Sequence, residues 1–175
     1  MKLACIFARQ YWEHKSSPVR RHVIKALLRH PSIQGVLTGQ GWDDYIETKT
    51  LQENLDRLCP KCDAVLLYKP YGNPRLNIPP LLRPSHVDAL KVIRLHEAWW
   101  DDETLSIELM NGDVDLALCT HENDMDRVAS FGVDVEHLPQ TAEVDIYRCD
   151  RPLSERQTHC LLAGNTSKEH YPLRS

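Results

Sequence analysis

The stretch that decides the fold is Asp63-Ala64-Val65-Leu66-Leu67-Tyr68, an almost unbroken apolar run. Runs of this kind are typical of strands that are buried on both faces of a parallel sheet. On both sides of it, further short apolar runs alternate with amphipathic segments. This pattern predicts strands over residues 2–8, 33–38, 63–68, 90–95, 114–119 and 135–138, and helices over residues 17–30, 51–59, 104–110 and 124–131.

The alternation of strands and helices predicts right-handed βαβ units. We therefore expect an α/β protein with a Rossmann-like, open and mostly parallel sheet that carries helices on both faces. Residues 1–150 are predicted to form this domain. Residues 151–175 are predicted to be a linker, followed by a strand from about residue 159 that starts a second, truncated domain.

Length and composition limit the class of protein. The chain has 175 residues, of which 42% are hydrophobic and 26% charged, which suits one globular domain rather than a disordered chain. Residues 1–30 carry seven Lys/Arg and one Glu, whereas residues 96–150 carry two Arg and fifteen Asp/Glu. No basic face dominates, so a nucleic-acid partner is not expected. The longest apolar runs are too short to span a membrane and no signal sequence is evident, which predicts a cytoplasmic location.

The six cysteines are then expected to be reduced thiols. Cys59 and Cys62 form the single CxxC motif, and a structural zinc site would need a second pair of ligands. The motif is predicted to follow a helix and precede a strand, which is not the position of a redox CxxC. We therefore interpret it as structural and predict no metal site.

Ligands of open parallel sheets bind beyond the carboxyl ends of the strands. The residues expected there combine aromatic rings, imidazoles, carboxylates and cations, which suits a polyhydroxylated ligand such as a sugar. A His or Glu at a strand end can act as a general base toward a hydroxyl. The candidate catalytic residues are His96, Glu97 and His121, and the candidate substrate-binding residues are Arg9, Tyr11, Trp12, Lys69, Trp99, Trp100, Asp101 and Glu122.

Each of these assignments has a purely structural alternative. Trp99 can pack under the end of the sheet, and His96 can bond to a backbone group. The His121-Glu122 pair can cap the following helix. No glycine-rich turn follows the first strand, and neither a P-loop nor a GxSxG motif is present, so no cofactor is predicted.

Several segments together resemble a known family. Six segments follow one another as they do in the amino-terminal half of GT-B glycosyltransferases, in particular those similar to spore maturation proteins. They are residues 63–69, 92–101, 115–121, 137–142, 161–166 and 170–174. The resemblance implies transfer of a sugar from a nucleotide-sugar to an acceptor. It implies that this half binds a sugar or glycan acceptor, that a second domain binds the nucleotide-sugar, and that this half alone is inactive. His96 and Glu97 stand where Glu-Asp is common in the family.

Three other functions stay open. The chain can be a stand-alone, non-catalytic binding or interaction module that forms a homodimer through residues 150–175. It can be a small metal-assisted hydrolase that uses His96, Glu97 and His121. Finally, the basic stripe of Arg21, Lys25 and Arg29 on the first predicted helix offers peripheral contact with anionic lipid.

Overall fold

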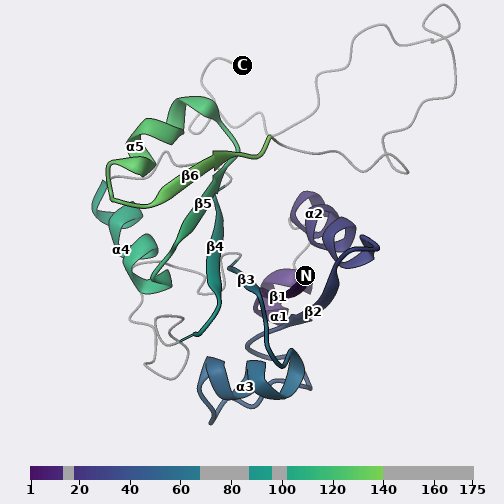
Figure 1. The fold of residues 1–175 in the computed structure, drawn as a ribbon. Coiled ribbons are helices and arrows are strands. Elements are labelled where there is room, and N and C mark those ends of the chain that lie inside the picture. The colour runs from purple at the N-terminus through teal and green to yellow at the C-terminus, as the bar shows by residue number, and fades with distance from the viewer. Residues whose placement is uncertain (14–17, 68–86, 96–101, 140–175) are drawn as a thin grey trace, which may run out of the picture. The chain divides into compact units, whose positions relative to one another are not determined.

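The computed structural model describes residues 1–13, 18–67, 87–95 and 102–139. Within this part of the chain a single open sheet has six strands, and every neighbouring pair is parallel (Figure 1). The strand order is β2-β1-β3-β4-β5-β6. The strands are β1 (Lys2–Ile6), β2 (Gln34–Thr38), β3 (Ala64–Leu67), β4 (Leu90–Leu95), β5 (Leu116–Cys119) and β6 (Asp134–His137). The predicted Rossmann-like α/β class is confirmed.

The helices connect consecutive strands. They are α1 (Arg9–Glu13), α2 (Pro18–Arg29), α3 (Leu51–Leu58), α4 (Asp102–Gly112), the short 3₁₀ helix η3 (Glu122–Asp124) and α5 (Met125–Ala129). The four predicted helices are present. The five-residue α1 was not predicted, and β1 ends at Ile6 rather than at residue 8. None of the described helices has both the length and the apolar composition needed to cross a bilayer.

Helix α3 shows why these segments form where they do. Thr50 and Glu53 form a capping box: the Glu53 amide donates to Thr50 Oγ1 (3.1 Å), and the Thr50 amide donates to Glu53 Oε2 (2.8 Å). The hydrogen bond from the Thr50 backbone lowers the pKa of Glu53. Leu51 and Leu55, spaced one helical turn apart, are buried against the sheet.

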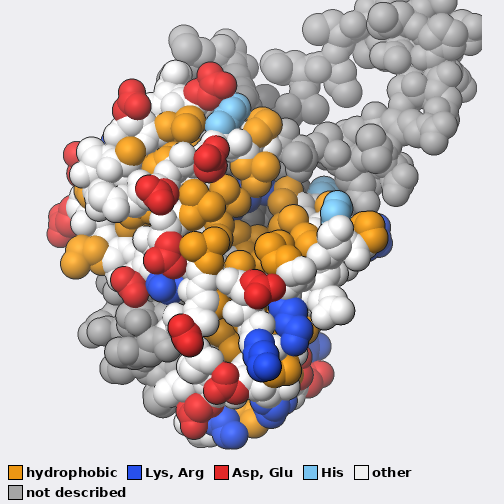
Figure 2. All heavy atoms as spheres, viewed as in Figure 1, with side chains coloured by type: hydrophobic (Ala, Val, Ile, Leu, Met, Phe, Trp, Pro, Cys, Tyr) orange, Lys and Arg blue, Asp and Glu red, His pale blue; other side chains and the backbone are white. Residues whose placement is uncertain are grey.

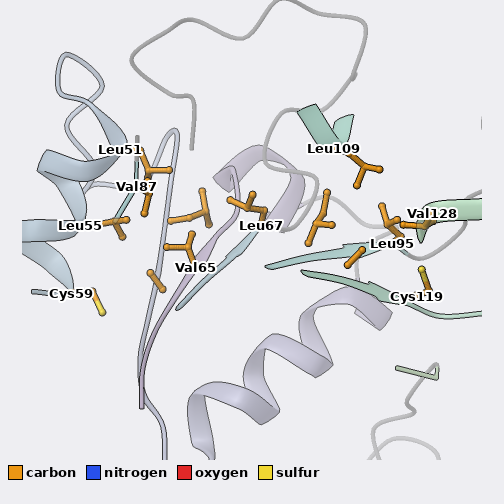
Figure 3. Close-up of a cluster of buried hydrophobic side chains, with 14 of the residues drawn as sticks. Leu51, Leu55, Cys59, Val65, Leu67, Val87, Leu95, Leu109, Cys119 and Val128 are labelled. Atoms are coloured by element: carbon orange, nitrogen blue, oxygen red, sulfur yellow. The ribbon is translucent and has the colours of Figure 1, made fainter. Parts of the chain in front are cut away.

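The sheet is covered by helices on both faces. On one face, side chains of α3, α4 and α5, including Leu105 and Val128, pack on strand residues such as Val65 and Leu67 (Figure 3). On the other face, Ile24 of α2 packs with strand residues that include Val92. We call the latter the α2 face. Neighbouring residues in β1, β3 and β4 alternate between the two cores, as the pleat of a strand requires.

The direction in which successive strands are added to the sheet reverses between β1 and β3. From β1 the chain passes to β2 at one edge, and from β3 onward each strand is added on the opposite side. Such a switch point is where open α/β sheets bind their ligands. Residues Met1–Glu143 form one compact unit. The boundary predicted at residue 150 and the whole of segment 151–175 lie outside the described residues.

Candidate functional site

Next to the switch point, on the β2 side of β1, the carboxyl ends of β1 and β2 are held close together. The Phe7 amide donates to the Thr38 carbonyl and the Arg9 amide to the Gln40 carbonyl, both at 2.9 Å, so the pairing continues past the ends of the strands. Gly39 lies between them with φ +138°, and a Cβ at this position would lie 3.0 Å from the Phe7 carbonyl oxygen. Glycine is the residue that tolerates both the backbone conformation and the close approach.

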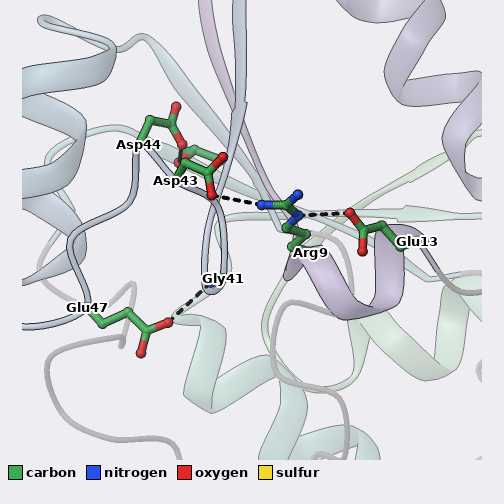
Figure 4. Close-up of polar contacts among 7 residues, drawn as sticks. Arg9, Glu13, Gly41, Asp43, Asp44 and Glu47 are labelled. Carbon is green, nitrogen blue, oxygen red and sulfur yellow. Dashed lines mark hydrogen bonds and ion pairs between the residues drawn. The ribbon is translucent and has the colours of Figure 1, made fainter.

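The paired segments after β1 and β2 hold one cation between two carboxylates. Arg9 Nε donates to Glu13 Oε1 at 2.8 Å, and Arg9 Nη1 donates to Asp43 Oδ1 at 2.9 Å (Figure 4). The hydrogen bond to Glu13 and the charge of Asp43 raise the pKa of Arg9. The three residues come from α1 and from the loop after β2, and we call them the switch-point cluster.

Two tryptophans border the switch-point cluster. Trp12 packs edge-on against Phe7 and Trp42, with ring centroids 5.8 and 6.1 Å away. Trp42 Nε1 donates to the Phe7 carbonyl at 2.7 Å, and the Arg9 guanidinium carbon lies 5.9 Å from the centre of the Trp42 ring. Both indoles are half-buried, so each packs on the protein with one part of its ring and leaves another part accessible.

The surroundings of the switch-point cluster are acidic. Glu47 accepts a hydrogen bond from the Gly41 amide (3.2 Å) and Asp44 accepts one from the Thr38 hydroxyl (3.3 Å). Next to them is a hollow of about 210 Å³, lined by Ala8, Gln10, Gln40, Gly41 and Glu47. Among the described residues, the carboxylates of Glu13, Asp43, Asp44 and Glu47 lie around the guanidinium of Arg9, while Arg57 donates to the Asp44 carbonyl and Arg21 lies over Trp12. The site suits a ligand that is rich in hydroxyl groups rather than a phosphate.

A second group of polar side chains follows β5 and β6. Glu122 Oε1 lies 3.3 Å from His137 Nδ1, and His137 Nε2 lies 3.3 Å from the Thr120 carbonyl oxygen. Both of these partners are acceptors, so a neutral imidazole, with its one N–H, donates to one of them at a time. His121 takes the N-cap position of η3, but its exposed side chain makes no capping hydrogen bond. The capping alternative for His121 is therefore not what the structure shows.

His137 is a site residue that the sequence analysis missed. It is the last residue of β6 and pairs in register with Cys119, the last residue of β5. The available signal was its position in the sixth predicted strand, one residue before that strand ends. His137 was not predicted because it belongs to the strand itself rather than to the segment after it.

Of the predicted site residues, Arg9 and Trp12 lie together beside the switch point, and His121 and Glu122 lie together after β5. Three strand spacings separate the ends of β1 and β5, which is roughly 14 Å at about 4.8 Å per strand. The side chain of Tyr11 and the whole of Lys69, His96, Glu97, Trp99, Trp100 and Asp101 lie outside the described residues.

The CxxC motif lies away from this edge, where β3 begins. Cys59 and Cys62 are free thiols, and the Cys62 thiol donates to the Ala64 carbonyl oxygen at 3.0 Å. Burial raises the pKa of Cys62 to about 11 and that of Cys5, in the adjacent strand, to about 12. Such thiols are poor nucleophiles at neutral pH. Within the described ranges, no group of three His, Cys, Asp or Glu side chains is arranged to hold a metal ion.

No protein-family model, curated protein or solved structure matches the chain. The fold class therefore rests on strand order and register, and the resemblance to GT-B glycosyltransferases stays a prediction.

Proposed function

We propose that the chain is the acceptor-side domain of a glycosyltransferase and binds a sugar or glycan acceptor at the carboxyl edge of its sheet. The observation that carries the proposal is the switch-point cluster, in which Arg9 is held between Glu13 and Asp43 beside two half-buried tryptophans.

The chemistry of the cluster matches that of a sugar. A sugar ring presents hydroxyl groups at its edge and apolar C–H groups on its faces. Carboxylate oxygens accept hydrogen bonds from hydroxyls, and a guanidinium donates to them. Indole rings offer apolar faces on which the C–H groups can pack. The ion pairs keep the charged groups in place before the ligand arrives, which reduces the entropy lost on binding.

The same edge also offers a base for transfer. His121 is exposed at the end of β5. A neutral imidazole in this place can accept the proton of an acceptor hydroxyl while that oxygen attacks the sugar donor. The nucleotide-sugar would be supplied by a separate domain. The ends of β1 and β5 are roughly 14 Å apart, so an acceptor that contacts both Arg9 and His121 needs at least two sugar rings.

The experiment is a titration of the isotope-labelled chain with mono- and disaccharides, followed by NMR. We expect chemical-shift changes at the backbone amides of Arg9, Gly41 and Trp42. Asp43→Asn, which changes a side chain that is 94% exposed, should weaken binding about tenfold because a charged hydrogen-bond partner is lost. Asp134→Asn is the matched control, since Asp134 is an exposed carboxylate at the opposite end of its strand. Equal weakening by both variants, or shifts confined to the amino ends of the strands, would contradict the proposal.

A second candidate function is a non-catalytic binding module. It is favoured by the contact of Glu122 with His137, which gives this carboxylate a partner within the chain. One measurement distinguishes the two functions. Transfer of a sugar from nucleotide-sugars to a bound disaccharide is assayed with the chain and a donor-binding domain that is added in trans. Binding without transfer, together with an unchanged affinity in His121→Ala, would favour the module.

A further inference from the structure

One arginine lies in the core of the sheet rather than at its edge. Arg94 is the fifth residue of β4, and its side chain is on the α2 face because Val92, two residues earlier, packs in the core of that face. Only 3% of Arg94 is exposed. Arginine is among the residues least often fully buried, and it is normally paired when it is.

Arg94 has no such pair within the described part of the chain. Its Nε, Nη1 and Nη2 atoms are all buried, and none has a hydrogen-bond partner among the residues that the structure describes. Burial lowers the pKa of Arg94, but a guanidinium stays protonated at neutral pH. A buried and unpaired cation is strongly unfavourable for folding. The simplest explanation for such a side chain is that an anion binds to it and balances its charge.

The surroundings of Arg94 are apolar. Leu118 pairs with it in register on β5, and Leu66 pairs with Val92 on β3. Leu116 and Leu118 are only partly buried on this face. Figure 2 shows hydrophobic side chains gathered in the middle of the visible face, over β4 and β5 and beside α2. The nitrogens of the guanidinium are themselves buried, whereas Leu116 and Leu118 beside Arg94 stay partly exposed to solvent.

The helix that packs on this face is basic, since α2 contains four Lys or Arg residues and no Asp or Glu. On the opposite side, Glu136 of β6 is in the same row as Leu118 and Arg94, two strands from the arginine. The Arg94 nitrogens form no hydrogen bond to it.

We propose that Arg94 is the anion-binding group of a second ligand site, on the α2 face of β4 and β5, which takes a small organic acid. The carboxylate or phosphate of the ligand pairs with the guanidinium, and its apolar body lies on Val92, Leu116 and Leu118. A planar guanidinium suits a bidentate pair with either kind of oxyanion. This second site is inferred from Arg94 alone, so it does not depend on the proposed sugar site.

The test compares the stability and ligand binding of three proteins. They are the wild-type chain, Arg94→Met and the control Lys25→Met, which removes an exposed cation of α2 and so makes the same change in net charge. Each is titrated with inorganic phosphate, acetate and octanoate in a chloride buffer, and the thermal midpoint and the Arg94 Nε–Hε NMR signal are recorded. Phosphate and acetate report on the oxyanion alone, whereas octanoate adds an apolar body.

We expect saturable binding to the wild-type chain and to Lys25→Met, with octanoate at least tenfold tighter than acetate and a shift of the Arg94 Nε–Hε signal. Arg94→Met should bind at least tenfold more weakly and should have a higher midpoint than the wild type without ligand, because it lacks the unpaired charge. If phosphate binds more tightly than octanoate, the ligand of the site is an acid that carries a phosphate group. Two results would overturn the proposal: equal responses of Arg94→Met and the wild type, or a lower midpoint of Arg94→Met without ligand, which would mean that the chain itself supplies the partner.

Discussion

Cys5 provides the most quantitative test of the structure. It lies in β1 with its side chain fully buried on the α2 face, between the positions of Leu3 and Phe7. Burial, and to a lesser extent the nearby thiols of Cys62 and Cys59, raise its pKa from 9.0 to about 12. The folded protein therefore keeps this thiol protonated over a range of pH in which the unfolded chain ionises it.

The sign of the effect follows from this difference. Below pH 9 the thiol is protonated in both states and has no effect on the pH dependence of stability. Between about pH 9 and 12 only the unfolded state releases the proton, so the free energy of unfolding falls as the pH rises. At about pH 10.5 the expected loss is about 2 kcal/mol, since each unit of pKa difference is worth about 1.4 kcal/mol.

The assay is urea unfolding followed by circular dichroism, at about pH 8 and about pH 10.5 with a phosphine reductant present. Other groups also titrate over this range, so the wild type is compared with Cys5→Ala. The variant loses packing at both pH values but lacks the ionisable group. We expect its stability to fall by about 2 kcal/mol less than that of the wild type. Equal falls in the two proteins would show that Cys5 is accessible to solvent in the folded state and would refute the reasoning.

Two further predictions concern packing and backbone conformation. Leu55→Ala, at a position that is 1% exposed, should lower the free energy of unfolding by about 3 kcal/mol, whereas Leu90→Ala, at one that is 47% exposed, should cost less than about 1 kcal/mol. Urea unfolding measures both, and similar losses would contradict the arrangement of the core. Gly39→Ala should cost more than Gly132→Ala in the same assay: both glycines have positive φ, but only at Gly39 would a Cβ meet another segment of the chain. The opposite order would argue against the close approach of β1 and β2.

Much of the fold can be predicted from local sequence. The apolar run at residues 63–68 predicted a strand buried on both faces, and Ala64–Leu67 is buried throughout. Helix α1 could not be predicted in this way, because no acidic residue begins it. It is held instead by its pairing with the segment after β2, where the Arg9 amide donates to the Gln40 carbonyl.

The candidate site, like the fold, could be predicted from the sequence only in part. Position after a strand predicted Arg9 and Trp12, since the carboxyl ends of parallel strands share one edge. It did not predict that Asp43 and Trp42 would join them, because these residues follow β2 and meet Arg9 only through the pairing of β1 with β2. Nor did it predict His137, whose contact with Glu122 depends on the pairing of β5 with β6.

The sequence by itself determined which segments are strands and helices and which polar residues stand at the strand ends, because these properties depend on neighbours along the chain. Only the tertiary structure decided the strand order, the partners of Arg9 and the burial of Arg94. These depend on register between strands that are far apart in sequence. In β4, the alternation of side chains places a single arginine on the same face as Val92, and the apolar residues of β3 and β5 then surround it.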